Sequence, residues 1–224
     1  MLYRIISLLI GYACGLCLGG GIMGRVRGVD LTKHGSGNVG TTNTIRVLGL
    51  PSGIVTFLID VFKSVIAALL VWLIYRNLTP DHVRLLMVYG AFGAVLGHDF
   101  PFYKKFKGGK GIATSFGLLI ACFPTTIPVC AAVFVLAVAI TRYISLGSIL
   151  ACAAFSIQVL IFAPLGLLPF EGVDLYEAVI LGCLVGIIGI ARHHANIGRL
   201  IHGTENKFTF RPKNTVSGPD KAEK

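Results

Sequence analysis

Hydrophobic residues occupy seven long stretches of this chain, and short polar segments separate one stretch from the next. The stretches cover residues 5–24, 52–75, 83–97, 111–122, 125–140, 146–168 and 174–192. A helix needs roughly 20 apolar residues to cross a bilayer, and the third, fourth and fifth stretches are shorter than that. The pattern predicts an all-α, polytopic integral membrane protein with seven transmembrane helices, the short ones being tilted, broken or flanked by re-entrant loops.

The composition agrees with a membrane protein. Hydrophobic residues make up 54% of the chain and charged residues 13%, with a mean hydropathy of +0.79, whereas a soluble domain carries about a quarter charged residues. In a soluble chain the net charge of +10 would suggest nucleic acid. Here we interpret it as a contact with anionic lipid headgroups, so membrane lipids are expected as partners and nucleic acid is not. Because residues 5–24 lack a suitable small-x-small cleavage site, we interpret them as a retained span rather than a signal peptide.

The positive charges predict the orientation. Of the 20 Lys and Arg residues, 16 fall on one predicted face, Arg4, Arg76 and Arg84 fall on the other, and Lys63 lies within a span. Cytoplasmic loops are enriched in Lys and Arg, which places the N-terminus outside and the C-terminus in the cytoplasm. Residues 1–202 are expected to form the membrane domain, and 203–224 a polar cytoplasmic tail.

The first polar cluster is Gly35-Ser36-Gly37-Asn38-Val39-Gly40-Thr41-Thr42-Asn43, followed by Arg46. Its glycines match a dinucleotide fingerprint, but no strand precedes them and no βαβ unit follows. Glycines still allow backbone N–H groups to converge on an oxyanion, while hydroxyls and a guanidinium add donors. The cluster predicts an anion site braced by its asparagines; the alternative is a polar turn between helices.

Two further clusters fall on the same predicted face. Lys107-Gly108-Gly109-Lys110-Gly111 opens the fourth stretch, where a helix N-terminus and an ammonium group suit a phosphate. The segment 192–199 ends the seventh stretch, and His193 and Asn196 would share a helix face at spacing i,i+3. His193 is a candidate general base. Each cluster alone could instead be an ordinary basic loop or an interfacial histidine.

Other polar residues and the cysteines favour structural roles. Asp60 and Lys63 are interpreted as a mutually neutralising pair, and His98 and Asp99 as the end of the third span, supporting the site from behind. The spacings Gly11–Gly15–Gly19, Gly93–Gly97 and Gly182–Gly186 predict close helix contacts. All six cysteines lie in apolar stretches, so Cys14-x-x-Cys17 is assigned to helix packing, and neither a metal site nor a disulfide is expected.

The three clusters together resemble those of the bacterial PlsY-type glycerol-3-phosphate acyltransferases. The similar motifs are Gly-Ser-Gly-Asn-x-Gly-x-Thr-Asn-x-x-Arg (35–46), Gly-His-x-Phe-Pro with Lys-Gly-Gly-Lys-Gly-x-Ala-Thr (97–114), and His-x-x-Asn-Ile-x-Arg-Leu with Gly-Thr-Glu (193–205). Thr41 departs from the family, which often has Ala there. The resemblance implies a cofactor-free, seven-span enzyme of the bacterial cytoplasmic (inner) membrane, with its active site facing the cytoplasm. It would transfer a fatty acyl group from acyl phosphate to the 1-hydroxyl of sn-glycerol 3-phosphate.

The resemblance also assigns roles to residues. The loop would hold the acyl-phosphate phosphoryl group through Ser36, Gly37, Asn38, Gly40, Thr41, Thr42 and Asn43, with Ser36 counted as catalytic. Glycerol 3-phosphate would be held by Arg46, Lys110, Ser145, His193 and Asn196, with Ser148 as the alternative to Ser145. The soluble enzyme that makes acyl phosphate is a candidate partner.

Direct transfer without an acyl-enzyme is expected, because phosphate is already a competent leaving group. The base is either His193 or an oxygen of the acyl phosphate itself. No histidine is followed five residues later by Asp, so the His-x4-Asp motif of acyltransferases that use thioesters is absent. Two other functional classes stay open at this point, a transporter of phosphate or an organophosphate and a structural membrane scaffold. A transporter would favour repeats and charges at the membrane midplane.

Overall fold

A computed structural model describes residues 1–209, and within them every regular element is helical. Short 3-10 turns at Leu31–Lys33, Pro80–His82, Phe102–Lys104 and Pro124–Thr126 link several of the helices. The α-helices are α1 (Leu2–Gly15), α2 (Gly19–Val26), α3 (Thr41–Leu48), α4 (Leu50–Tyr75), α5 (Val83–Asp99), α6 (Ile112–Cys122), α7 (Ile127–Thr141), α8 (Ile144–Phe162), α9 (Gly172–Ala191) and α10 (His194–Ile201).

Six helical segments of the described chain are long and apolar enough to cross a membrane. They are Leu2–Val26, Leu50–Tyr75, Pro80–Lys104, Pro124–Thr141, Ile144–Phe162 and Gly172–Ala191. The expectation that the third stretch is short was wrong, because the turns flanking α5 extend that segment to 25 residues. The fourth stretch is α6, whose 11 residues rise only about 17 Å. The all-helical membrane class is therefore confirmed with six spans, while α6 is a short apolar helix.

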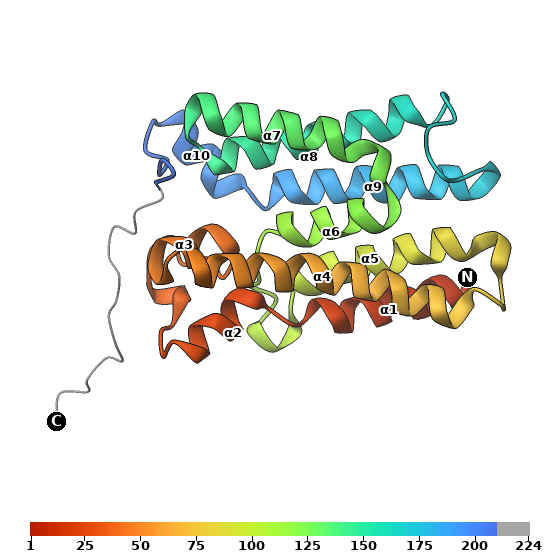
Figure 1. The fold of residues 1–224 in the computed structure, drawn as a ribbon, viewed down its shortest axis with the longest axis horizontal. Coiled ribbons are helices and arrows are strands. Elements are labelled where there is room, and N and C mark those ends of the chain that lie inside the picture. The colour runs from red at the N-terminus through yellow and green to blue at the C-terminus, as the bar shows by residue number, and fades with distance from the viewer. Residues whose placement is uncertain (210–224) are drawn as a thin grey trace.

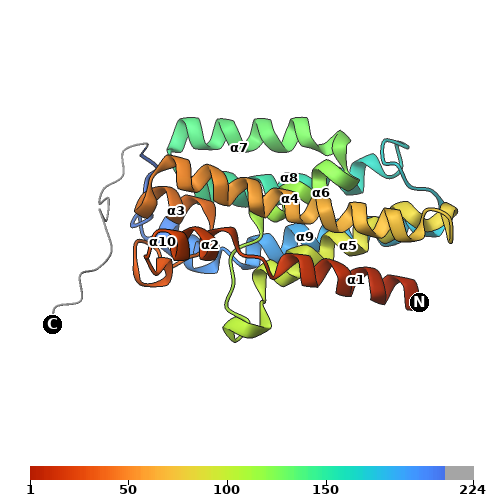
Figure 2. The same ribbon diagram turned by 60° about the horizontal axis from the view of Figure 1, so that its bottom comes forward.

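The helices form two layers with α6 between them. Figure 1 shows α7, α8 and α9 along one side and α1, α4 and α5 along the other, and Figure 2 shows the same bundle from below. Phe123, at the end of α6, is fully buried and packs against Phe155 of α8 and Phe170. The N-terminus lies at one end of the bundle, and α3 and α10 lie at the other (Figure 1).

Glycines allow the close helix contacts that their spacing predicts. A Cβ atom added to Gly11 or Gly15 of α1 would collide with the backbone of α5 at Gly90 or Ala94. In return, a Cβ at Gly93 of α5 would collide with the backbone of α1. The backbones of α1 and α5 therefore touch along this seam, as small residues permit in membrane proteins.

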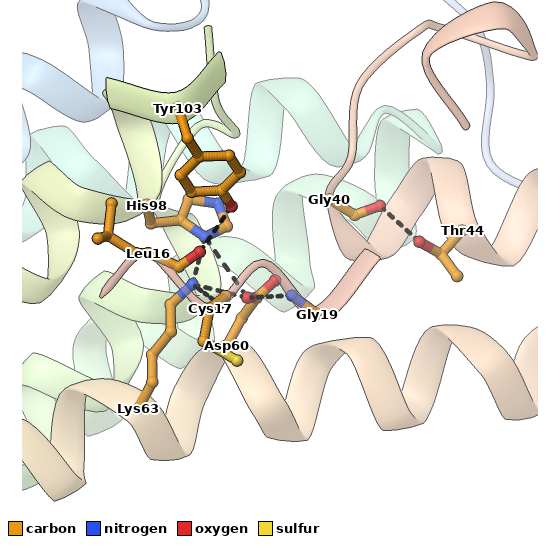
Figure 3. A network of polar contacts seen from close by, with 9 residues as sticks. All are labelled: Leu16, Cys17, Gly19, Gly40, Thr44, Asp60, Lys63, His98 and Tyr103. Atoms are coloured by element: carbon orange, nitrogen blue, oxygen red, sulfur yellow. Dashed lines mark hydrogen bonds and ion pairs between the residues drawn. The ribbon is translucent and has the colours of Figure 1, made fainter. Parts of the chain in front are cut away.

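The first span is broken, although the sequence predicts one continuous stretch. Helix α1 ends at Gly15 and α2 begins at Gly19, so backbone groups at membrane depth lack partners within the helix. Buried side chains replace those partners (Figure 3): Asp60 Oδ1 accepts from Gly19 N at 3.2 Å, and Lys63 Nζ donates to Cys17 O at 2.9 Å. Lys63 Nζ also lies 2.8 Å from Asp60 Oδ1, which confirms the predicted pair. The pair thus supports irregular backbone that a bilayer would otherwise exclude.

Candidate active site

One cavity of about 230 Å³ collects residues from all three polar clusters at the α3 and α10 end of the bundle. Every residue that the sequence assigns to substrate lines it, except Gly37. Gly37 has a φ of +71° and its N–H donates to His34 O, so it shapes the turn that precedes the cavity. The polar part of the lining comprises Ser36, Asn38, Gly40, Thr41, Thr42, Asn43, Arg46, Asp60, His98, Lys110, Ser145, Ser148, His193, Asn196, Arg199, Glu205 and Asn206.

The Gly-rich loop is wrapped around the side chain of Asn43. Asn43 Oδ1 accepts from Ser36 N at 2.8 Å, and its Nδ2 donates to Asn38 O at 2.9 Å and His34 O at 3.1 Å. The side-chain amide is almost fully buried and already engaged, so it fits the bracing role more closely than direct contact with a phosphate. Helix α3 then begins at Thr41, whose hydroxyl has no partner among the described residues, and its N-terminus opens onto the cavity.

The loop that carries Lys110 is fastened to two neighbouring spans. Arg192, just after α9, donates to Gly109 O at 2.7 Å and Gly108 O at 3.2 Å. The N–H groups of the same two glycines donate to Asp99 O and His98 O at the end of α5, each at 3.1 Å. Asp99 does end α5, as the sequence predicts. These bonds place Lys110 at the cavity wall, where its ammonium donates to Asn196 Oδ1.

The third cluster does not continue the last span as one helix. Helix α9 ends at Ala191 and a separate helix, α10, begins at His194, so His193 lies at the junction. His193 and Asn196 nevertheless both line the cavity, as their predicted shared face requires. Polar contacts fix the histidine ring, because His193 Nδ1 lies 2.7 Å from Gly189 O. Donation from Nδ1 to this carbonyl leaves Nε2 as the basic nitrogen of the neutral ring.

Burial and charge tune the groups at the cavity wall. Burial, with the charges of Arg199, Arg192 and Arg46 acting in the same direction, lowers the pKa of Lys110 to about 8. Burial, the Lys110 charge and Arg192 lower the pKa of His193 to about 4. His193 is therefore neutral at pH 7, while Arg46, Lys110 and Arg199 make the wall rich in cations.

Glu205 belongs to this wall, although the sequence reasoning gave it no role. Its carboxylate accepts from Arg199 Nε at 2.8 Å and from Asn196 Nδ2 at 3.1 Å, and only 7% of its side chain is exposed. Glu205 thus orients Asn196, whose Oδ1 then meets Lys110. Two signals were available: Glu205 ends the third motif, and it is the one acidic residue between Glu177 and Asp220.

The structure distinguishes the two candidate serines. Ser148 Oγ donates to the carbonyl of Ile144 at 2.9 Å, one turn earlier in α8. Ser145 Oγ is buried and has no hydrogen-bond partner among the described residues. Both serines line the cavity, but the Ser148 hydroxyl proton is already donated, whereas that of Ser145 is not.

Comparison with known proteins identifies the family. A family model described as glycerol-3-phosphate acyltransferase matches residues 5–203. The chain belongs to the glycerol-3-phosphate acyltransferase family. A relative named glycerol-3-phosphate acyltransferase from Chlorobaculum parvum is 40% identical, covering 84% of this chain and 89% of its own.

Two solved structures share the acyltransferase fold. The crystal structure of PlsY (YgiH), an integral membrane glycerol 3-phosphate acyltransferase, in its glycerol 3-phosphate form matches with a TM-score of 0.77 and 30% identity. The lysophosphatidic acid form of the same protein matches with a TM-score of 0.75 and 29% identity. Each match covers 92% of this chain and 96% of the solved chain. The resemblance that the motifs suggest is therefore confirmed at the level of family and fold.

Proposed function

We propose that this protein transfers a fatty acyl group from acyl phosphate to the 1-hydroxyl of sn-glycerol 3-phosphate, releasing phosphate and lysophosphatidate as the first step of phospholipid synthesis. One observation carries the proposal: a single cavity is lined by a Gly-rich loop of hydrogen-bond donors and, beside it, by Arg46, Lys110 and Asn196. Two phosphate-binding groups side by side suit a reaction in which both substrates carry phosphate.

The acyl phosphate is assigned to the loop. Its phosphoryl oxygens would meet the hydroxyls of Ser36, Thr41 and Thr42 and the N-terminus of α3, where backbone N–H groups favour anions. Asn43 would contribute by holding the loop in shape, since its amide binds Ser36 N and Asn38 O. As the acyl group leaves, the same donors would stabilise charge that shifts onto phosphate.

Glycerol 3-phosphate is assigned to the cationic wall. Arg46 can form a bidentate contact with its phosphate, and Lys110 can add a point charge. The partly buried guanidinium of Arg46 lies close enough to Arg199 and Glu205 to interact electrostatically with both. Ser145 and Asn196 would then orient the glycerol part, with the free Ser145 hydroxyl supporting that choice over Ser148.

The proposed chemistry is one direct displacement. The 1-hydroxyl oxygen attacks the acyl carbonyl carbon, the bond from that carbon to the phosphate oxygen breaks, and phosphate departs with the electron pair. The hydroxyl proton passes to His193 Nε2 or to an oxygen of the acyl phosphate. A neutral His193 suits the first route, and the two negative phosphates would raise its pKa from about 4. Holding both reactants in one cavity supplies much of the acceleration.

We also propose the topology that the sequence predicts. Helix α6 runs antiparallel to α7 in Figure 1, which supports counting this short helix as a seventh, partial pass. The N-terminus would then lie outside and the cavity would face the cytoplasm of a bacterial inner membrane. Residues 1–202 would form the membrane domain and residues 203–224 its tail, of which 210–224 lie outside the described residues.

The test is phosphate release by detergent-purified protein. The protein is given palmitoyl phosphate with and without sn-glycerol 3-phosphate, and palmitoyl-CoA serves as the control donor. Phosphate and lysophosphatidate that appear only with both substrates, and none with the CoA control, are the expected result. Equal product from palmitoyl-CoA would refute the donor. No product from folded protein would favour the transporter, and uptake of labelled phosphate into liposomes would then follow.

A further inference from the structure

A second cavity, of about 450 Å³, lies behind the Gly-rich loop. It is enclosed by the break in the first span, α2, residues 28–31 and the segment that follows α5; Figures 1 and 2 both place that segment beside α2. Val39 lines this cavity, while its neighbours Asn38 and Gly40 line the candidate active site. The two cavities share no lining residue, so the loop separates them.

Polarity changes from one end of this second cavity to the other. Leu16, Leu18 and Ile22 line it at and just after the break within the first span. Arg25 is the second-last residue of the first span, which ends at Val26. Lys104 is the last residue of the third span. Helix α2 rises about 12 Å over its eight residues, so the apolar part lies at membrane depth and the cationic part at the membrane surface.

The cationic end carries excess positive charge. Asp30 is the one acidic residue among those that line the cavity, against the two cations Arg25 and Lys104. Its carboxylate is also turned toward its own loop, where Oδ1 accepts from Thr32 N at 3.0 Å and from Thr32 Oγ1 at 2.7 Å. The Tyr103 hydroxyl is likewise used, since it donates to Leu16 O at 2.7 Å. Arg25 and Lys104, together with the apolar lining, therefore suit an anion that carries a hydrophobic tail.

We propose that this cavity binds a membrane lipid with an anionic phosphate headgroup, held by Arg25 and Lys104, with an acyl chain along α2. Basic residues at the membrane surface attract such headgroups, while the apolar half would give inorganic phosphate nothing to bind. A diacyl phospholipid and lysophosphatidate share this chemistry. The proposal concerns a site separate from the reaction and does not depend on the identity of the acyl donor.

The position of the cavity gives the lipid a route to influence the active site. A Cβ atom at Gly20 of α2 would collide with Val39 O, so α2 and the loop are in backbone contact. Residues 28–31 are tied to the same helix, because Val29 N donates to Gly24 O at 2.9 Å. A bound lipid would therefore contact Val39, on the side of the Gly-rich loop opposite the one proposed to hold acyl phosphate.

The first test compares lipid binding by charge variants. Native mass spectrometry of detergent-purified protein counts bound phosphatidylglycerol against phosphatidylcholine with the same acyl chains. Each basic residue near a headgroup contributes about a fivefold factor, so Arg25→Gln with Lys104→Gln should weaken phosphatidylglycerol binding by roughly 30-fold. The matched control is Arg27→Gln with Lys105→Gln, two exposed residues that do not line the cavity. Equal binding by both double variants would overturn the proposal.

A second variant fills the cavity without touching its charges. A Cβ at Gly21 would meet only Leu18 Cβ, at 3.6 Å, so a larger side chain fits. Gly21→Phe should abolish selective phosphatidylglycerol binding while the thermal melting temperature stays within a few degrees of wild type. Unchanged binding by this variant would contradict the site. If added lysophosphatidate competes with phosphatidylglycerol, lysophosphatidate is an occupant of the site; if it does not compete, the site binds diacyl lipid. If the protein prefers neither lipid over phosphatidylcholine, the proposal is overturned.

Discussion

Replacing Lys63 by Met should destabilise the protein strongly, because the buried ammonium of Lys63 has three polar partners. Its ammonium contacts Asp60 Oδ1 at 2.8 Å, Cys17 O at 2.9 Å and His98 Nδ1 at 2.6 Å, and the residue is only 5% exposed (Figure 3). The substitution takes the ammonium away from the buried Asp60 carboxylate, which keeps Gly19 N as a donor and His98 Nδ1 at 3.4 Å. It also removes the donor to Cys17 O at the break in the first span.

The expected cost follows from the buried charge. Removing one partner of a buried ion pair costs about 3–5 kcal/mol, and losing the hydrogen bond to Cys17 O costs about 1 kcal/mol more. For a chain of this size each kcal/mol lowers the melting temperature by roughly 2–4 °C. Lys63→Met should therefore lower the melting temperature by about 10 °C or more.

A thiol-reactive fluorophore can follow the melting in detergent. Cys122, Cys130 and Cys152 are buried and become accessible only on unfolding, whereas Cys17 is exposed and sets the baseline. The matched control is Lys107→Met, an exposed lysine whose loss should change the melting temperature by less than 2 °C. A Lys63→Met protein that melts within 2 °C of wild type would contradict the stabilising role of the buried pair.

The double variant Asp60→Asn with Lys63→Met separates charge from packing. Both charges are then gone, so no unpaired ion is buried, and the protein should regain at least half of the lost stability. The double-mutant cycle measures the coupling between the two residues. A double variant less stable than Lys63→Met alone would show that the two side chains act independently.

The remaining predictions concern the candidate active site. Arg46→Ala and Lys110→Ala should each lower activity more than tenfold, chiefly by raising KM for glycerol 3-phosphate; wild-type kinetics in both would contradict the assignment. Because the pKa of Lys110 is about 8, this KM should rise as pH increases from 7.5 to 9, whereas Lys110→Arg, charged throughout, should show a flat profile. Ser145→Ala should impair activity more than Ser148→Ala, since Ser148 Oγ already binds Ile144 O; equal effects would count against Ser145. If His193 is the base, His193→Asn should lower kcat far more than it raises KM, and an effect on KM alone would make it a binding residue.

Several features of this protein can be predicted from short, continuous segments of its sequence. Apolar stretches of sufficient length predict membrane helices because a bilayer selects for length and composition, both properties of a continuous segment. The same reasoning recovers the bracing role of asparagine in the loop, since Asn43 lies seven residues from Ser36. It also recovers the glycine seams, because a missing side chain permits close contact wherever the partner helix lies.

The position of the helix break and the short length of α6 depend on segments distant in sequence. The break at residues 16–18 is stable because Asp60 and Lys63, more than 40 residues later, supply hydrogen bonds there. The run Gly19-Gly20-Gly21 lowers the helix propensity of the first stretch locally, but it does not by itself show where the helix stops. Likewise, α6 is short because the loop from Phe100 to Gly111 folds back to α5 and Arg192 before the helix begins.

The sequence alone determined the class of protein, the residues of the three polar clusters and the family that they resemble, because each depends on residue type and spacing. The tertiary structure decided which of those residues have hydrogen-bond partners within the protein. It engaged Asn43 with the loop, left Ser145 free rather than Ser148, and brought Glu205 to Asn196. These outcomes depend on which polar groups find partners after the helices pack, and such pairing is a property of the folded chain rather than of any one segment.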